Sequence, residues 1–232
     1  MSIIETPTLN RARQLALAYD GHDAEPLLRA FIEHEFPGRI ALVSSFGSEA
    51  ALLLHIVAEI DRGLPVIFLD TGKLFGETLR YRDNLVRRLG LTDLRIVKPE
   101  PEALAAGDPD SLLSHTNPDA CCALRKVAPL KNALAGFDAW ISGRKRYQGA
   151  LRQFMPVIEA SGDKIKLNPL ARWPRERVDA EFAARNLPRH PLEEDGFLSI
   201  GCMPCTERVA PGADARSGRW AGQEKTECGI HL

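Results

Sequence analysis

The 232-residue sequence lacks any uninterrupted apolar run of about 18 residues, the length that a membrane-spanning helix needs. Its opening residues also lack the basic stretch and the long apolar run of a secretory signal peptide. We therefore expect a cytosolic protein with no membrane span, in a compartment where thiols stay reduced. Net charge is nearly absent too, because 30 Lys and Arg residues against 31 Asp and Glu residues leave −1. Such a balance gives no global basic field that would favour nucleic acid as a partner.

Cysteine is scarce as well, with five residues, but its placement is informative. Two close pairs, Cys121-Cys122 and Cys202-x-x-Cys205, lie far apart along the chain, and Cys228 stands alone near the end. Clustered cysteines in a cytosolic protein favour metal binding or catalysis over structural disulfides. Four paired cysteines and one isolated cysteine are the number expected for a bound centre with a separate reactive thiol.

Apolar runs and helical repeats alternate along the middle of the chain, with no internal repeat and no low-complexity linker. The spacing predicts strands at 39–43, 66–69, 94–97 and 139–142, helices at 49–60, 75–89 and 177–186, and a hairpin within 157–167. Two further helical segments, at 9–19 and 25–35, precede the first strand. Strand and helix in this rhythm predict an α/β, doubly wound core with a parallel sheet and right-handed crossovers.

One cysteine pair falls on a predicted helix with a clear start signal. Residues 107–117 are polar and are expected to form a surface loop, and Asn117-Pro118 suits a helix N-cap followed by proline in the first turn. Cys121 and Cys122 then lie in the opening turns of that helix.

The four paired cysteines predict a soft-metal centre. Adjacent residues on a helix point about 100° apart, so tetrahedral zinc is awkward for both, whereas a cubane iron–sulfur cluster spreads its ligand sites more widely. Arg125 and Lys126 follow the two cysteines by one helical turn and place positive charge beside the thiolates. The alternatives are a free buried thiol at Cys122 and a redox-active dithiol formed by Cys202 with Cys205.

Two loops are candidates for nucleotide binding, because the carboxyl ends of parallel strands meet at one sheet edge. The turn after the first strand offers hydroxyls and backbone N–H groups at the start of a helix, which is an anion site, although an ordinary turn has the same pattern. The second loop, after the next strand, could hold a ribose or purine, or could cap the following helix. Together the two loops favour a nucleotide. The first loop is Ser44, Ser45, Phe46, Gly47 and Ser48, and the second is Asp70, Thr71 and Gly72.

Basic residues gather in two places, Arg144-Lys145-Arg146 after a predicted strand and Arg216 with Arg219 before the end of the chain. Arginine forks match phosphate and sulfate oxygens bidentately, so the arginines are candidate ligands of an anionic nucleotide. For Lys145 we expect an ordinary solvated position.

Taken together, these motifs resemble the assimilatory adenylyl-sulfate reductases, within the wider phosphoadenylyl-sulfate (PAPS) reductase family, from about residue 44 to 232. The resemblance is carried by Ser45-Phe46-Gly47, Leu69-Asp70-Thr71-Gly72, Cys121-Cys122 with Arg125-Lys126, Cys202-x-x-Cys205 and Glu227-Cys228-Gly229-Ile230-His231. It implies an adenine nucleotide α-hydrolase-like (PP-loop) domain. We then expect a helical lead-in at 1–38, a nucleotide-binding and iron–sulfur reductase domain at 39–210, and a mobile segment at 211–232. Gly76 and Ser48-Glu49-Ala50 depart from the family pattern, which leaves the individual substrate contacts open.

The same resemblance implies roles for individual residues. Cys121, Cys122, Cys202 and Cys205 match the ligands of a [4Fe-4S] cluster, and Lys126 matches a lysine close to it. The substrate would contact the two loops, Lys126, Arg144, Arg146, Arg216, Arg219 and His231. Cys228 matches the nucleophile.

The implied reaction is the reduction of adenosine 5′-phosphosulfate (APS) in sulfate assimilation and cysteine biosynthesis. Cys228 attacks the sulfur of APS, AMP leaves, and an S-sulfocysteine forms. Thioredoxin, or a glutaredoxin-like dithiol protein, then releases sulfite. Because the sequence ends four residues after Cys228, we expect a separate reductant protein. The sequence leaves open whether the protein forms a homo-oligomer.

Three rival functions remain. A PAPS reductase, or an enzyme that uses both substrates, has the same chemistry, but relatives restricted to PAPS usually lack the four cluster cysteines. An ATP-dependent enzyme, such as a tRNA-thiolating one, would be expected to have a Ser-Gly-Gly-x-Asp-Ser loop, which is absent from this sequence. A zinc-stabilised nucleotide-binding module without catalysis leaves Cys228 without a purpose.

Overall fold

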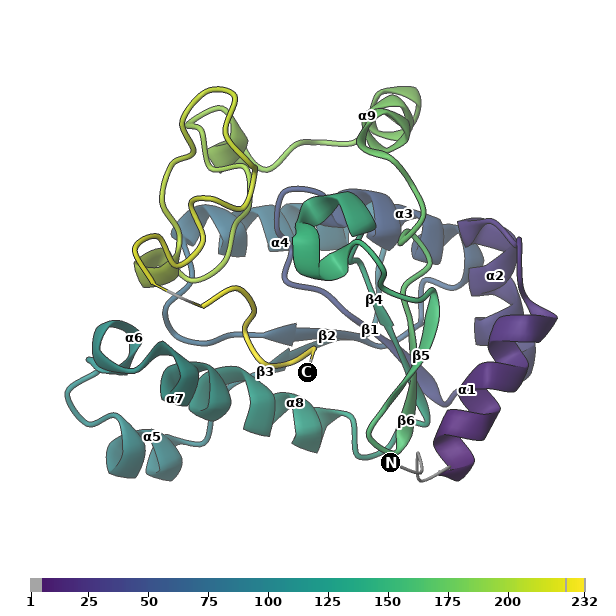
Figure 1. Cartoon of the computed structure of the whole chain (residues 1–232), viewed down its shortest axis with the longest axis horizontal. Coiled ribbons are helices and arrows are strands. Elements are labelled where there is room, and N and C mark those ends of the chain that lie inside the picture. Colours follow the sequence, from purple (N-terminus) through teal and green to yellow (C-terminus); the bar gives the residue numbers. More distant parts are fainter. Residues whose placement is uncertain (1–5, 224, 232) are drawn as a thin grey trace.

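The computed structural model describes residues 6–223 and 225–231 (Figure 1). The predicted lead-in begins, and the predicted terminal segment ends, with residues that lie outside this description. Among the described residues, no helix combines the length and the hydropathy that crossing a membrane would require.

The centre of the fold is a six-stranded sheet in the order β3-β2-β1-β4-β6-β5. The pairs along it are parallel except for β5 with β6, which form an antiparallel hairpin. The strands are β1 (Ile40–Val43), β2 (Val66–Leu69), β3 (Leu94–Val97), β4 (Ala139–Ser142), β5 (Ile158–Ser161) and β6 (Lys164–Leu167). The predicted strands, their parallel pairing and the hairpin are therefore confirmed.

Helices cover both faces of this sheet, with α3 and α4 on one side and α7 and α8 on the other (Figure 1). The α-helices are α1 (Pro7–Ala18), α2 (Ala24–Ala30), α3 (Ala50–Ile60), α4 (Gly76–Leu89), α5 (Pro101–Gly107), α6 (Leu113–Thr116), α7 (Pro118–Cys122), α8 (Ala128–Ala133) and α9 (Arg175–Ala184). Two π-helical turns are η1 (Phe31–Glu35) and η2 (Ala123–Val127), and short 3₁₀ turns are η3 (Arg146–Gln148), η4 (Ala150–Arg152), η5 (Pro191–Glu193) and η6 (Met203–Cys205).

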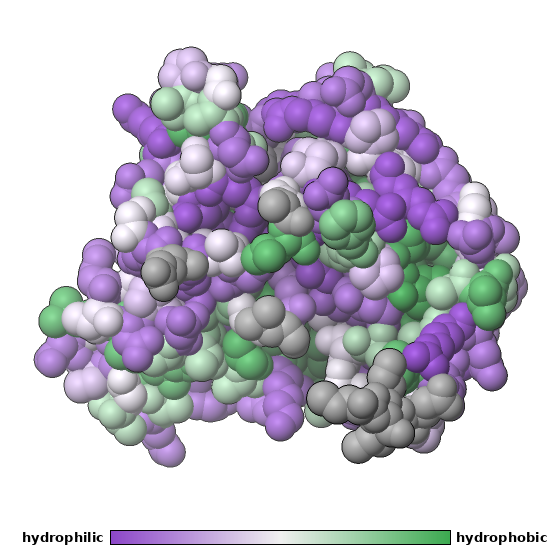
Figure 2. Space-filling model, in the orientation of Figure 1, coloured by the Kyte–Doolittle hydropathy of each residue, from purple (hydrophilic) through white to green (hydrophobic). Residues whose placement is uncertain are grey.

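The two helical layers follow from the composition of the strands. Successive side chains of a strand point to opposite faces, and a parallel strand buried on both faces must be apolar throughout. In β1, Ile40 and Leu42 join the larger core under α3 and α4, whereas Ala41 joins a smaller core that contains Trp140 and lies under α8. Figure 2 shows that the outer surface on the viewed side is mainly hydrophilic, with small groups of hydrophobic residues.

The region before the cysteine pair is more helical than expected. We predicted that 107–117 would be a loop, but α6 lies inside the supposed loop, and a further helix, α5, starts before it at Pro101. Proline suits the first turn of a helix because the N–H it lacks has no partner there. The predicted cap is confirmed, since the side-chain oxygen of Asn117 accepts a hydrogen bond from the N–H of Ala120 at 3.0 Å.

Candidate active site

A cavity of about 220 Å³ opens where β1, β2 and β4 end, and it is lined by Val43, Leu69 and Ser142 from these strands. The carboxyl edge of a parallel sheet is the usual place for a nucleotide. The C-terminal residues run along the same edge, between the sheet and α8 (Figure 1). Residues that follow β1, near position 44, therefore meet residues of the C-terminal segment in one cavity.

The loop after β1 lines this cavity through its small residues. Ser44, Ser45, Gly47 and Ser48 belong to the lining. Phe46 does not, because its side chain is fully buried and lies edge-on to Phe68 with the ring centroids 5.5 Å apart. The backbone of Phe46 has a φ of 49°, which is unusual for a bulky residue, and the hydroxyl of Ser44 accepts its N–H at 3.2 Å. Phe46 thus anchors the loop while the serines face the cavity.

The structure brings most of the other predicted site residues to this cavity. Those that line it are Lys126, Arg144, Arg216, Arg219, Cys228 and His231. They come from the cysteine-bearing helix, the end of β4 and the C-terminal segment, which are separate in sequence.

Besides Phe46, four predicted substrate-binding residues do not belong to the lining. Asp70 accepts the N–H of Gly72 at 3.1 Å, and the hydroxyl of Thr71 lies 3.2 Å from Sγ of Cys202. Arg146 points elsewhere, since its Nε donates to the carbonyl of Met155 at 3.0 Å. The second loop therefore contacts the cysteine region, and a role in binding the substrate stays a prediction for it and for Arg146.

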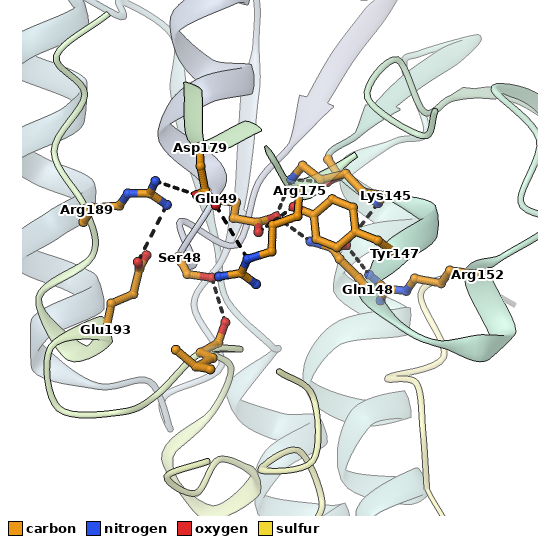
Figure 3. A network of polar contacts seen from close by, with 12 residues as sticks. Ser48, Glu49, Lys145, Tyr147, Gln148, Arg152, Arg175, Asp179, Arg189 and Glu193 are labelled. Atoms are coloured by element: carbon orange, nitrogen blue, oxygen red, sulfur yellow. Dashed lines mark hydrogen bonds and ion pairs between the residues drawn. The ribbon is translucent and has the colours of Figure 1, made fainter. Parts of the chain in front are cut away.

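The expectation for Lys145 was wrong, because this residue is 2% exposed and lines the cavity. Its Nζ lies 2.8 Å from Oε2 of Glu49, whose carboxylate also accepts bonds from Tyr147 and Gln148 (Figure 3). Burial raises the pKa of Glu49, but the charge of Lys145 and these hydrogen bonds outweigh it and lower the pKa below its ordinary value. The pair stays ionised because each charge supplies the partner that water would otherwise provide.

Sequence reasoning also missed the ion pair that holds the C-terminal segment. The guanidinium of Arg152 donates two hydrogen bonds to the carboxylate of Glu227, at 2.6 and 2.9 Å, and both residues line the cavity. Arg152 lies in a segment without periodicity, and the sequence gives no signal that would have paired these two residues 75 positions apart.

The end of the chain is docked in this structure. Ile230 packs against the smaller core, and the ring of His231 stacks on Trp140 with centroids 5.8 Å apart and an interplanar angle of 9°. Burial, together with the positive charges of Arg144 and Lys166, holds the pKa of His231 well below its usual range, so the imidazole is neutral. Cys228 is thereby held in the cavity wall.

The two cysteine pairs approach each other through the loop after β2. Cys202 forms a β-bridge with Leu74 and contacts Thr71, while Arg125 from the cysteine helix donates to the carbonyl of Thr71 at 3.0 Å. The four paired cysteines are buried free thiols. Burial raises the pKa of Cys121, and negative charge on Cys202 and Cys205 adds to this rise despite the opposing charge of Arg125.

The helix that carries Cys121 and Cys122 widens into the π turn η2 immediately after them. Pro129, in the following α8, has no N–H with which to continue the regular hydrogen-bond ladder. Wide turns of this kind occur often at functional sites. Here η2 carries Arg125 and Lys126, the first of which binds the loop after β2 and the second of which faces the cavity.

Lys126 and Arg219 bring positive charge to Cys228. Burial lowers the pKa of Lys126, but the negative charges of Cys202 and Cys228 outweigh it and raise the pKa. Burial also lowers the pKa of Arg219. The negative charge of Cys228 is the largest of the effects that oppose this lowering. Within the described part of the chain, neither cation has a carboxylate at ion-pair distance. An anionic ligand beside Cys228 would complete their pairing.

The donor set of the four paired cysteines fits a thiolate-bound centre. Four thiolates are the ligand set of a [4Fe-4S] cluster and also of structural zinc. Across residues 6–223 and 225–231, no three His, Cys, Asp or Glu side chains are arranged as a site for one metal ion.

Comparison with known proteins places these features in a family context. The family model described as the phosphoadenosine phosphosulfate reductase domain matches residues 39–208. The chain is 57% identical over 197 residues to the adenosine 5′-phosphosulfate reductase of Mesorhizobium japonicum, covering 85% of this chain and 78% of that protein. It is 54% identical over 195 residues to the adenosine 5′-phosphosulfate reductase of a Chelativorans species, covering 84% and 80%.

A solved structure gives the same answer for the fold. The crystal structure of the phosphoadenylyl-sulfate reductase of Candida auris, a phosphate complex, superposes with a TM-score of 0.72 at 27% identity. It covers 90% of this chain and all of that one. The adenine nucleotide α-hydrolase-like fold expected from the sequence is thereby confirmed.

Proposed function

The chain belongs to the phosphoadenosine phosphosulfate reductase family, and we propose that its reduction of adenosine 5′-phosphosulfate proceeds through Cys228 and a dithiol protein. APS reduction is its activity. The observation that carries the proposed route is the position of Cys228 in the cavity wall, beside Lys126 and Arg219. A nucleophilic thiol near two cations that lack carboxylate partners suits an anionic substrate.

In the first proposed step, the Cys228 thiolate attacks the sulfur of APS. A bond forms between Sγ and this sulfur, and the bond from sulfur to the bridging phosphate oxygen breaks, so that AMP leaves with the electron pair. The enzyme then carries an S-sulfocysteine. Lys126, Arg216 and Arg219 would offset the charge of the phosphosulfate while the anionic thiolate approaches it.

In the second proposed step, a thiolate of a dithiol protein such as thioredoxin attacks Sγ of Cys228 and sulfite leaves. The second thiol of the partner then displaces Cys228, which regains its thiolate, and the partner becomes a disulfide. The partner dithiol thus supplies the two electrons of the reduction. Cys228 lies in the cavity wall in the docked structure, so this step requires the segment at 211–232 to move outward.

The substrate is proposed to lie along the loop after β1. The hydroxyls of Ser44, Ser45 and Ser48 and the backbone N–H groups at the start of α3 suit phosphate oxygens. The apolar lining near Leu54 and Phe68 suits a purine ring. Arg144 and His231 would complete the end of the site that binds the anionic group of the substrate.

We also propose that Cys121, Cys122, Cys202 and Cys205 hold a [4Fe-4S] cluster. Support comes from their donor type, their burial and the contacts that join their two segments through Thr71. When bound, the cluster would tie these segments together and set the electrostatic environment of Lys126. Free thiols of this kind suit a cytosolic location.

The test is sulfite release by anaerobically purified protein with thioredoxin, comparing APS with its 3′-phosphorylated form. A strong preference for APS supports the proposal, whereas equal or reversed preference assigns the chain to PAPS or to dual use. The variant Cys228→Ser should bind APS but form no sulfocysteine, as intact-protein mass reports. Full turnover by this variant would refute the proposed route. Iron and acid-labile sulfide analysis of the same preparation separates a cluster from zinc.

A further inference from the structure

The residue before the nucleophile has an unusually specific partner. Nε and Nη2 of Arg152 donate to Oε1 and Oε2 of Glu227 at 2.6 and 2.9 Å, which is the bidentate geometry of a strong ion pair. The exposed fractions of the two side chains are 10% and 14%. Arg216 supports the contact by donating to the carbonyl of Thr226 at 2.7 Å. The backbone on the N-terminal side of Cys228 is therefore tied to the body of the domain.

The third nitrogen of Arg152 connects this ion pair to the loop after β1. Its Nη1 donates to Oε1 of Gln148 at 2.8 Å, and Nε2 of the same amide donates to Oε2 of Glu49 at 2.7 Å (Figure 3). The amide orientation of Gln148 is fixed, because its Oε1 also accepts the N–H of Lys145 at 3.0 Å. A continuous chain of hydrogen bonds thus runs from Glu49 to Glu227.

The two ends of this chain of bonds matter for the reaction. Glu49 immediately follows the loop whose serines line the cavity and immediately precedes α3. Glu227 immediately precedes Cys228. The connecting residues Gln148 and Arg152 line both the cavity and a second groove. The hydrogen-bonded chain therefore lies where the cavity and the second groove share their lining.

We propose that Glu49, Gln148, Arg152 and Glu227 form a tail latch that positions Cys228 against the cavity. Gln148 and Arg152 are positioning residues in this scheme, since they act on the thiol only through Glu227. The latch couples the substrate loop to the nucleophile, because a shift of Glu49 withdraws the acceptor that orients Gln148 and Arg152. Its catalytic consequence rests on the proposed function of Cys228, whereas its existence can be tested without any substrate.

The first test measures how fast Cys228 reacts with iodoacetamide in the resting full-length protein. Cleavage after Lys225 releases the peptide 226–232, in which Cys228 is the sole cysteine, so mass spectrometry reads this thiol alone. The variants are Glu227→Gln and Gln148→Ala, and Glu207→Gln, an exposed carboxylate in the same C-terminal region, is the matched control. We expect roughly tenfold faster alkylation in each of the two latch variants, from the loss of a hydrogen bond to a charged group, and no change in the control.

The double variant separates a latch from general loosening. If Gln148 acts through Arg152 and Glu227, then Gln148→Ala adds little once Glu227→Gln is present, and the double variant alkylates about as fast as either single one. Independent structural damage would multiply the two effects instead. Multiplied effects, or a Gln148→Ala rate equal to that of the unaltered protein, would overturn the proposal.

The catalytic consequence is measured in a single turnover with APS and no reductant. Sulfocysteine formation should slow in Glu227→Gln and Gln148→Ala, whereas thioredoxin should discharge preformed sulfocysteine at least as fast as in the unaltered protein, since release of the segment is easier. If the unaltered protein forms no sulfocysteine, the proposed function is refuted. The alkylation rates of the single and double variants still test the latch in that case. Unchanged sulfocysteine formation in both variants would refute the positioning role.

Discussion

Replacing Glu49 by glutamine should cost more stability than the loss of any exposed ion pair in this protein. The carboxylate lies 2.8 Å from Nζ of Lys145 and accepts further hydrogen bonds from Tyr147 at 2.6 Å and Gln148 at 2.7 Å. Lys145 is 2% exposed, so the neutral amide would leave a buried ammonium without its counter-charge. Breaking a buried pair in this way costs about 3–5 kcal/mol, a large part of the roughly 5–15 kcal/mol that holds a domain together.

Urea unfolding at neutral pH, followed by far-UV circular dichroism, measures this loss. The matched control is Glu59→Gln, which removes a 47% exposed carboxylate that pairs with Arg185 at 2.7 Å and should cost at most about 1 kcal/mol. Adding Lys145→Met to Glu49→Gln removes both buried charges and should recover much of the loss. A single variant within about 1 kcal/mol of the unaltered protein would refute the reasoning, as would a double variant less stable than the single one.

The same pair predicts a direction for the pH dependence of stability. The folded state lowers the pKa of Glu49, so its contribution is present above the unfolded pKa and is lost as pH falls through the folded one. The free energy of unfolding of the unaltered protein should therefore fall on acidification more steeply than that of the doubly substituted protein. Parallel curves would show that Glu49 does not titrate with folding.

Three further predictions concern other parts of the fold. A Cβ at Gly218 would lie 2.2 Å from the carbonyl oxygen of Glu207, so Gly218→Ala should displace the C-terminal segment and speed its proteolysis, whereas Gly136→Ala, with open space around the added atom, should not. Removing the cap of the cysteine helix by Asn117→Ala should lower the urea midpoint by an amount that corresponds to about 1 kcal/mol, and no change would show that the cap is dispensable. Burial lowers the pKa of His190 from 6.5 to about 4, so stability should be full above 6.5 and fall between these values. His190→Gln should flatten that decline in a urea series, and an unchanged slope would contradict it.

The sheet could be predicted because its strands carry their own signal. Short apolar runs such as Ile40–Val43 and Val66–Leu69 are buried on both faces, so every residue of the run is apolar and the pattern is local. The antiparallel hairpin was equally readable from the turn residues between β5 and β6. Helix α6 was not predicted because it lies inside a polar segment; there the side chain of Asp108, five positions earlier, accepts the N–H of Leu113 at 3.0 Å.

The residues of the candidate site also fall into those that the sequence could predict and those that it could not. Residues within recognisable motifs, such as Cys228 and Arg219, could be named from the sequence, and the structure places them in the cavity lining. Lys145 could not be read correctly, because a lysine in a basic run looks solvated until its partner 96 positions earlier is known. Glu227 belongs to the terminal motif, but its pairing with Arg152 could not be read from the sequence, because the two residues are 75 positions apart and meet only when folding brings them within hydrogen-bond distance.

The pairing of charges around the cavity leaves two cations beside Cys228, the proposed nucleophile, without a carboxylate partner among the described residues. Glu49 neutralises Lys145, Glu159 neutralises Arg144, and Glu227 neutralises Arg152. Within the described residues, Lys126 and Arg219 are left without a carboxylate at this distance, and both interact with the charge of Cys228. Because the paired cations have their charge satisfied by protein, the proposed function implies that a phosphosulfate would gain most beside the unpaired ones. If Cys228 is the nucleophile as proposed, the carboxylates would direct the substrate as much as the cations do, by leaving positive charge uncompensated next to its sulfur.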